Sequence, residues 1–117
     1  MALDEANHRL FLGCRQPARL LVYDTTSGSL VTAVDIVGDT DDLFYDSANK
    51  RLYVIGGEGF ITVLEQQDAD HYRQIQKLPT AAGARTGLFV PELAKIFLAV
   101  PHRGAQGAEI RVYDVGH

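Results

Sequence analysis

The chain has 117 residues, of which 46% are hydrophobic, and a formal net charge of -4. This length and composition fit one folded domain with a core of its own. The acidic balance, and the absence of any run of basic residues interleaved with aromatic ones, argue against nucleic acid or an anionic membrane as a partner. A single cysteine, Cys14, excludes an internal disulfide and any zinc site built from several cysteines, and we expect it to be a small apolar residue on a strand.

No apolar stretch approaches the length of about 18 residues that a membrane helix needs. The first ten residues, MALDEANHRL, lack the basic start and apolar middle of a signal peptide. We therefore expect neither a membrane span nor a leader in this chain. These observations leave the localisation of the protein open.

Short segments rich in Val, Ile, Leu, Phe and Tyr alternate with turns that contain Gly, Asn, Asp and Ser, which is the pattern of β-strands. Ten such segments follow one another along the chain, at residues 9–14, 19–24, 29–37, 41–46, 51–56, 60–65, 72–79, 86–91, 95–100 and 109–114. Between the second and third of them, Thr25 to Gly28 form a turn, so these two strands make a hairpin. No segment keeps an apolar period of three to four residues over three helical turns, and the predicted fold class is all-β.

Three segments of the chain resemble one another, DEANHRLFLG, DSANKRLYVIG and VPELAKIFLAV, at residues 4–13, 46–56 and 90–100. In this alignment Leu10, Leu52 and Ile96 correspond, at spacings of 42 and 44 residues, and each follows a basic residue. A four-stranded unit with a period of about 40 to 45 residues is typical of the blades of a β-propeller. The sequence therefore predicts one propeller segment with blade repeats at about residues 1–41, 42–85 and 86–117.

The repeat combines Asp-x-x-x-[Lys/Arg]-Leu-aromatic-Val with a Val-x-x-Asp strand, a Thr-x-Gly turn and a strand ending in Val-Gly. This pattern resembles the YVTN-type (YncE-like) β-propeller repeat family, and residues 46–54, 20–28 and 29–38 carry the resemblance. The third repeat departs from it at Pro91 and Leu93, and the second has Glu65 where the family favours Asp. The resemblance covers nearly the whole chain and implies the C-terminal portion of a propeller. Full-length members of the family are often exported.

Ten strands make about two and a half four-stranded blades, with only MAL left of an inner strand at the N-terminus. Propellers close with about four to eight blades, so this chain alone cannot close a ring and would expose its terminal blade faces. Two explanations are open. Either the chain belongs to a longer propeller, or several copies associate to complete the ring. Both predict at least a dimer in solution and no stable monomer.

Antiparallel strands would bring two kinds of loop to one face of the propeller. These are the connections between blades, at residues 38–42 and 80–86, and the loops after the second strand of each repeat, which carry Arg15, Gln16, Glu58, His102 and Arg103. The resemblance implies that ligands bind at this face, around the mouth of the channel. The candidate ligand-binding residues are Asp41, Asp42, Arg85, His102 and Arg103.

Two interpretations of these residues are open. In one, Arg85, His102 and Arg103 bind an anionic group while Asp41 or Asp42 serves as an acid, a base or a metal ligand. In the other, Asp41 and Arg85 form an ion pair between blades and the remaining loop residues are solvated. The last of these loops, within VPHRGAQG, is five residues longer than its counterpart, by the 16 residues from Ile96 to Val112 against 11 from Leu52 to Val63.

Apart from that first interpretation, we expect no metal site, no cofactor and no catalytic residue in this chain. Asp39, Asp41 and Asp42 lack the Asp-x-Asp-x-Asp-Gly spacing of a calcium loop. The four histidines fall at different places, with His8 and His71 on the opposite face, His102 on the ligand face and His117 at the end of the chain. The glycines of residues 56–59 follow a strand without a helix after them, so they indicate a tight hairpin and not a phosphate-binding loop.

We therefore expect a non-catalytic propeller segment that serves as a scaffold for a small anionic ligand or a protein partner, completed by self-association or by the remainder of a longer propeller. The alternative, implied by the resemblance, is a share of a propeller enzyme, either a lactonase-like hydrolase or a quinone- or haem-dependent redox protein. Residues 39–42, 85 and 102–103 would then be its contribution to the active site. The metal or cofactor content of the purified protein would discriminate between the two.

Overall fold

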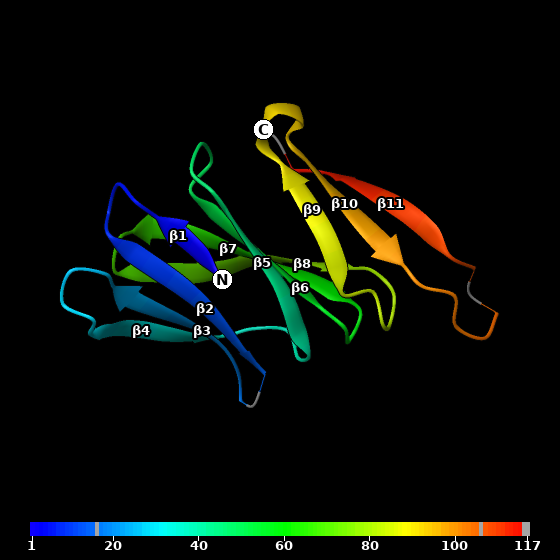
Figure 1. The fold of residues 1–117 in the computed structure, drawn as a ribbon, viewed down its shortest axis with the longest axis horizontal. Helices are drawn as coiled ribbons and strands as arrows, with labels where there is room; N and C mark the ends of the chain where they lie inside the picture. The colour runs from blue at the N-terminus through cyan, green and yellow to red at the C-terminus, as the bar shows by residue number, and fades with distance from the viewer. Residues whose placement is uncertain (16, 106, 116–117) are drawn as a thin grey trace.

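Figure 1 presents the computed structural model of the protein, which describes residues 1–15, 17–105 and 107–115. Within these residues the chain forms eleven strands and one 3-10 turn, η1 (Pro91–Leu93). The strands in chain order are β1 (Ala2–Asp4), β2 (Arg9–Arg15), β3 (Ala18–Asp24), β4 (Leu30–Asp35), β5 (Thr40–Asp46), β6 (Arg51–Gly56), β7 (Phe60–Asp68), β8 (His71–Pro79), β9 (Thr86–Val90), β10 (Lys95–Val100) and β11 (Glu109–Asp114). None of the described elements is a helix long and apolar enough to cross a membrane.

The strands form three antiparallel sheets, each built from consecutive strands. The first sheet contains β1 to β4, the second sheet β5 to β8, and the third sheet β9 to β11. The predicted all-β class and the four-stranded antiparallel arrangement are confirmed for the first two sheets. In the described residues the third sheet has three strands, with β11 at its edge.

The expectation of ten strands was wrong by one, because the first residues form β1. This strand pairs with β2, with Ala2 opposite Phe11 and Asp4 opposite Arg9. Three residues suffice because the side chain of Asp4 accepts a hydrogen bond of 2.8 Å from the side chain of Asn7 and so fixes the turn into β2. The first sheet is therefore complete. The other ten predicted strands all form, and their ends differ from the prediction by three residues or fewer.

The turn between the first two strands has the same backbone conformation in each sheet. His8, Lys50 and Ala94 hold the last turn position with φ of 56°, 56° and 53°, in the left-handed region. In the first two turns an aspartate accepts hydrogen bonds from an asparagine three residues on, in the pairs Asp4–Asn7 and Asp46–Asn49. The third turn has η1 in their place. The three segments aligned in the sequence thus occupy matching positions in three sheets.

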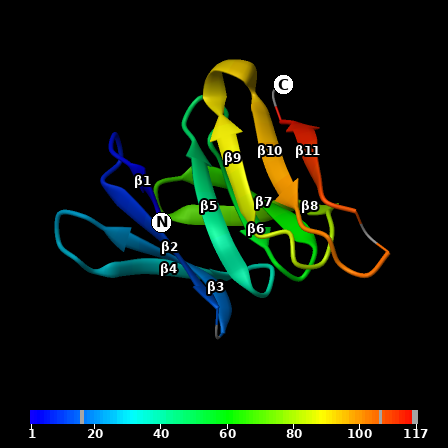
Figure 2. The same cartoon turned by 45° about the vertical axis from the view of Figure 1, so that its right-hand side comes forward.

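The three sheets stack face to face, with the second sheet between the other two (Figures 1 and 2). Side chains of the first and second sheets and of the connection between them share one apolar core, formed by Phe11, Leu20, Val22, Val37, Leu43, Leu52, Val54 and Leu64. Side chains of the second and third sheets, of the β8–β9 connection and of the residue after β11 share another, formed by Tyr53, Ile55, Ile61, Val63, Ala81, Ala84, Phe89, Ile96, Leu98, Val100 and Val115. Because neighbouring side chains of a strand point to opposite faces, β6 contributes Leu52 and Val54 to one core and Tyr53 and Ile55 to the other.

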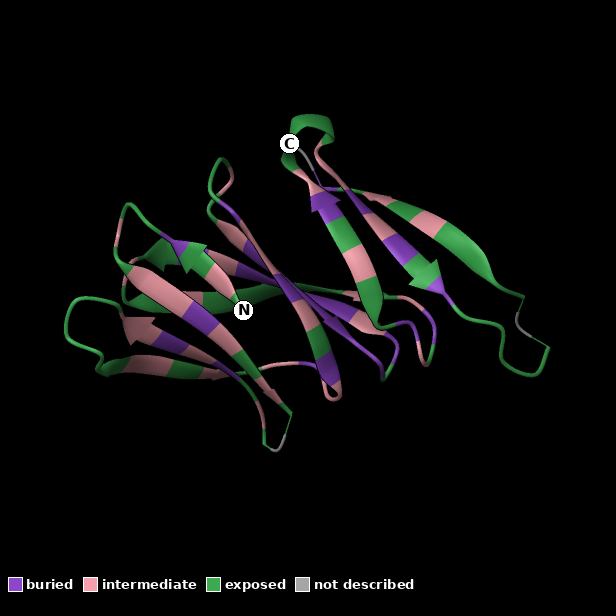
Figure 3. Cartoon of the chain, in the orientation of Figure 1, coloured by how far each residue is buried: buried purple, intermediate pink, exposed green. Residues whose placement is uncertain are grey.

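The outer face of the third sheet is open to solvent, as the exposed segments of β9 and β11 in Figure 3 show, and that of the first sheet is only partly covered. Leu88, Ile110 and Val112 of the third sheet are exposed, and so is Leu3 of the first. Exposed terminal faces were expected from the sequence, and the structure has them. Cys14, the free cysteine on β2, is half-buried.

Candidate functional site

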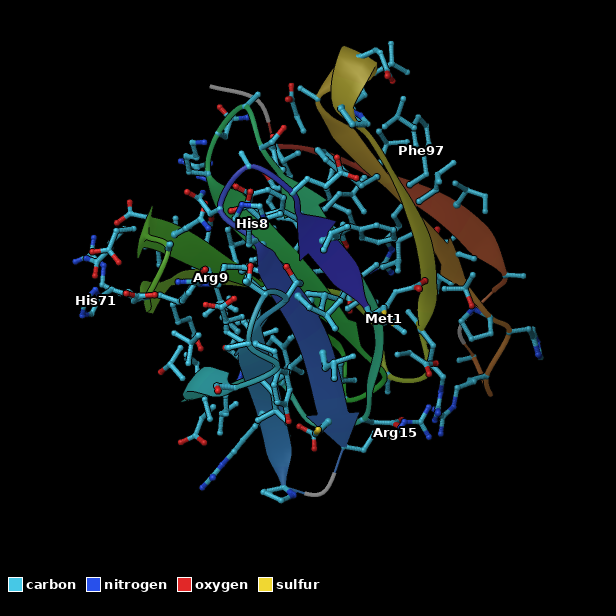
Figure 4. All side chains as sticks on the ribbon, turned by 60° about the vertical axis from the view of Figure 1, so that its left-hand side comes forward. Met1, His8, Arg9, Arg15, His71 and Phe97 are labelled. Carbon is cyan, nitrogen blue, oxygen red and sulfur yellow. The ribbon has the colours of Figure 1, made fainter. Side chains whose placement is uncertain are left out.

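The loops predicted to share one face do lie together, along one edge of the stacked sheets that we call the loop edge. It consists of the connections between sheets and the loops β2–β3, β6–β7 and β10–β11 (Figure 2). The backbone joins them, since Gly57 N donates to Asp39 O at 2.8 Å and Gly83 N donates to Gly57 O at 2.8 Å. His8 lies at the other end of β2 from Arg15 (Figure 4), so the predicted assignment of the two edges is confirmed for these residues.

Glycines allow the loops to approach so closely. A Cβ atom on Gly38 would overlap the Glu58 carboxylate, and a Cβ atom on Gly57 would overlap a carboxylate oxygen of Asp39. Gly83 has a φ of 84°, in the region that glycine adopts more easily than other residues, and the Arg103 guanidinium lies against it. These positions therefore bring charged side chains from different sheets into contact.

Asp39 is the centre of a charged network at the loop edge. Its carboxylate pairs with Arg85, with Nη2 2.7 Å from Oδ2 and Nη1 3.2 Å from Oδ1. Arg15 lies 3.9 Å from Asp39 and forms a second ion pair with Asp41 at 2.5 Å. The side chains contact one another in the order Asp41, Arg15, Asp39 and Arg85. The network thus reaches from the first two sheets to the connection that enters the third. All four side chains remain partly exposed, so the network orients the loops more than it stabilises the fold.

The predicted ion pair between Asp41 and Arg85 is wrong, because each of these residues has another partner. Asp41 lies at the start of β5, beside the end of β2, and so meets Arg15. Asp39 precedes β5 in a left-handed conformation, with φ of 55°, and its side chain meets Arg85 instead. The sequence analysis considered Asp39 in the search for metal ligands and within residues 39–42 of the alternative active site, but not as a partner of Arg85. Its place next to a glycine, in the connection between two strands, was the one signal that could have marked it.

Asp42 holds the second and third sheets together. One of its carboxylate oxygens accepts a hydrogen bond of 3.0 Å from Gly87 N on β9. This contact is possible because Gly87 has no side chain, and a Cβ atom there would overlap Ile55. The role of Asp42 in this structure is therefore structural, while the sequence had made it a candidate ligand residue.

His102 and Arg103 lie in the long β10–β11 loop, and both are exposed. The loop runs from Pro101 to Ala108, against Gly57 to Gly59 for β6–β7, so the predicted difference of five residues is confirmed. Within the described residues Arg103 forms no ion pair, although it contacts Gly83. Gln16, which the sequence placed in the β2–β3 loop, falls outside the described residues.

Two hollows open on the loop edge. The larger has a volume of about 650 Å³ and is lined by Arg15, Ala18, Gly38, Asp39 and Glu58, so it presents charges of both signs. The smaller has a volume of about 230 Å³ and is lined by Gly83, Arg85, Thr86, Ala99, Val100 and Pro101. Because Arg103 lies against Gly83, the smaller hollow has an arginine in its wall and a second arginine at its rim. Of the charged residues predicted for a ligand, the structure brings these two to one hollow.

The carboxyl and hydroxyl groups with shifted pKa values at the interfaces of the sheets form hydrogen bonds within the fold and do not line the two hollows of the loop edge. Burial acts to raise the pKa of Asp4, but hydrogen bonds from Asn7 and Gln66 outweigh it and lower that pKa below its usual value. Burial raises the pKa values of Tyr45 and Tyr53, which donate hydrogen bonds to Gln66 and Asp46. In the described part of the chain, no three His, Cys, Asp or Glu side chains are grouped so as to hold a metal ion.

Comparison with protein-family models found no match for this sequence, and comparison with curated proteins found none. The charged residues of the loop edge and their geometry therefore carry the functional interpretation.

Proposed function

We propose that the three sheets are blades of a β-propeller and that the chain is a non-catalytic scaffold, which binds a small anionic ligand at the loop edge. Support for the blades comes from the stacking of consecutive antiparallel sheets and from the matching turns before β2, β6 and β10. The first strands of the sheets, β1, β5 and β9, lie next to one another, as inner strands around a channel do. This assignment agrees with the family resemblance seen in the sequence.

The observation that carries the ligand proposal is the smaller hollow between Arg85 and Arg103. Asp39 holds the Arg85 guanidinium by one hydrogen bond and a second close ion-pair contact, so this cation has a fixed orientation before a ligand arrives. Arg103 has no ion pair within the described residues and is free to meet an anion. Arginine presents a planar set of donors that matches the oxygens of a carboxylate or phosphate. A volume of about 230 Å³ admits one such group and a short chain attached to it.

The carboxylates of the loop edge support a binding role over a catalytic one. Asp39 and Asp41 are engaged by arginines and Asp42 by a backbone amide. A general base must reach a proton of the substrate, and these three side chains already hold the loops in place. Around the smaller hollow, the cations Arg85 and Arg103 are then the charged groups that a ligand can use.

The experiment is a titration of the purified chain with citrate and with inorganic phosphate, followed by calorimetry or by amide chemical shifts. Arg103→Ala and Arg85→Ala should each weaken binding about tenfold, because each removes a charge-assisted hydrogen bond worth about 1.5 kcal/mol. Arg73→Ala is the matched control, since Arg73 is an exposed arginine on β8 whose partner is Glu65. His102→Ala tests the remaining predicted residue.

Binding that is unchanged in both Arg85→Ala and Arg103→Ala would overturn the proposal. Binding that falls equally in Arg73→Ala would also overturn it, because it would reflect general charge and not this site. Circular dichroism of each variant checks that the fold is retained.

A further inference from the structure

We infer that the open face of the third sheet binds the open face of the first sheet of a second copy, head to tail, and that two copies close a ring of six sheets. The contact depends on the blade assignment proposed above and not on the anion site. Each sheet has a following face, which meets the next sheet in chain order, and a preceding face, which meets the sheet before it.

The following face uses the same positions in all three sheets. Strand register places an aromatic residue opposite a valine each time, in the pairs Phe11–Val22, Tyr53–Val63 and Phe97–Val112. In the first two sheets these faces are covered, and Val22 and Val63 are 0% and 2% exposed. In the third sheet Val112 is 53% exposed. The third sheet thus presents side chains of a kind that the other two sheets bury.

The neighbours of Val112 extend this apolar surface. Ile110, on the same strand and face, is 65% exposed, while the residues at its position in the other sheets, Leu20 and Ile61, are fully buried. Leu88 lies on β9 opposite Phe97 of β10, and it is 59% exposed. An open surface with this pattern on all three strands indicates a missing neighbour sheet.

The preceding face of the first sheet likewise has apolar residues that no neighbouring sheet covers. Leu52 and Val54 in the second sheet are fully buried against the first sheet. The residues at the same positions in the third sheet, Ile96 and Leu98, are fully buried against the second. Their counterparts in the first sheet, Leu10 and Leu12, are only half-buried. They line an apolar hollow of about 410 Å³ together with Tyr23, Asp24, Thr25 and Gly28. Leu3 beside them is 47% exposed.

Both interfaces inside the chain join a following face to a preceding face, and one face of each kind is left open. A second copy supplies the matching face for each, so the new contact repeats a packing that the chain already forms twice. In those contacts an aromatic residue of the following face meets aromatic rings of the next sheet. Phe11 lies 5.3 Å from Tyr45 and 5.6 Å from Tyr72 between ring centroids, and Tyr53 lies 5.1 Å from Phe89. Phe97 would take the same place against the first sheet of the partner.

The number of sheets favours two copies. A head-to-tail contact forms a ring only if its rotation closes, and otherwise it gives an open filament. Two copies of three sheets make six, within the range of about four to eight blades in which propellers close. Three copies would make nine, outside that range. The same contact then occurs twice in one ring.

The test is the mass of the purified 117-residue chain by size exclusion with light scattering. We expect twice the mass of one chain, which is 12.8 kDa. Val112→Asp on the following face and Leu12→Asp on the preceding face should each give single chains, because each places a charge in both contacts of the ring. Leu93→Asp is the matched control, since Leu93 is an exposed leucine in η1, outside both faces, and should leave the mass unchanged.

Mixing the two variants distinguishes head-to-tail packing from packing of like faces. A Val112→Asp chain keeps an intact preceding face and a Leu12→Asp chain keeps an intact following face, so the mixture should recover a two-chain species through one contact. If two following faces met instead, Leu12→Asp alone would keep the dimer and overturn the proposal. A wild-type chain that runs as a single chain at every concentration, as expected if a further sheet of a longer chain were the natural partner, would also overturn it.

Citrate titration of the same samples separates this proposal from the anion site. A single-chain species that still binds citrate through Arg103 refutes only the ring. A two-chain species without that binding refutes only the ligand proposal.

Discussion

Replacing Phe11 by alanine tests whether the first two sheets pack as described. Phe11 is fully buried and its ring contacts those of Tyr45 and Tyr72, which belong to the second sheet. Phenylalanine-to-alanine changes at buried sites cost about 3 to 5 kcal/mol, through lost transfer free energy and the cavity left behind. A chain of this size has a free energy of unfolding of about 6 to 18 kcal/mol at 0.05–0.15 kcal/mol per residue, so the loss would be a large part of the total.

Phe97→Ala is the comparison that isolates the neighbouring sheet. Phe97 occupies the same register position in the third sheet, where none of the three described sheets packs over it, and it is half-buried. Its replacement should cost about 1 kcal/mol in the single chain, in proportion to the apolar area it buries. Urea unfolding, followed by circular dichroism at concentrations where the protein is a single chain, measures both values.

Equal losses for Phe11→Ala and Phe97→Ala would refute the packing, because they would mean that the two positions have the same environment. A loss below about 1 kcal/mol for Phe11→Ala would refute it as well, since a side chain enclosed by two sheets cannot be removed at so low a cost.

Three further predictions concern the loop edge and the turns. Asp39→Asn should raise citrate affinity about fivefold in calorimetry. Asparagine can still accept a hydrogen bond from Arg85 and keep its orientation, but it lacks the negative charge that competes for this cation, which is worth about 1 kcal/mol at this range. An unchanged or lower affinity would contradict the anion site. The pKa of Asp4 is lower in the folded state than in the unfolded state. The contribution of Asp4 to the free energy of unfolding is therefore present above about pH 4 and is lost as the pH falls through the pKa of the folded state. Asp4→Asn should then flatten the decline of the urea midpoint between about pH 5 and pH 2 relative to wild type. Gly56→Ala should lower the free energy of unfolding by about 1 to 3 kcal/mol, because the added Cβ would lie 2.5 Å from a valine side chain and 2.6 Å from a backbone oxygen. Gly107 has open space around it, so Gly107→Ala should leave thermal unfolding unchanged.

Strand positions could be predicted because each strand has its own local pattern. The alternation of apolar residues and the turn residues at 25–28 are properties of a few consecutive positions, and they located ten strands. β1 was missed because three residues are too few to show a pattern, and it forms only by pairing with β2. The alignment with the first two turns did not predict the 3-10 turn η1, which lies where strands 86–91 and 95–100 were expected to be joined, but η1 keeps the left-handed residue, Ala94, that the other two turns have.

The candidate site was predicted less well because its contacts depend on backbone conformation and not on sequence spacing. The alignment located the right loops, and Arg85 and Arg103 do lie at one hollow. It placed Asp41 opposite Arg85, but Asp39, whose backbone is left-handed with φ of 55°, meets that arginine instead. The open terminal faces were predicted from the number of repeats, not from local residue pattern, since Phe11 and Phe97 occur in the same pattern and differ only in what packs on them.

The burial of β6 on both sides has a consequence for how the molecule opens. The first and third sheets each contact the second sheet, and their cores are separate. Opening of either outer sheet therefore leaves the other interface intact, while opening of β6 or β7 requires both to be lost. Backbone amides in these two strands should exchange with solvent only through global unfolding, and those of β4 and β11 through local fluctuations that cost much less free energy. The middle sheet is then the cooperative unit of the chain, and the two outer sheets are docked onto it.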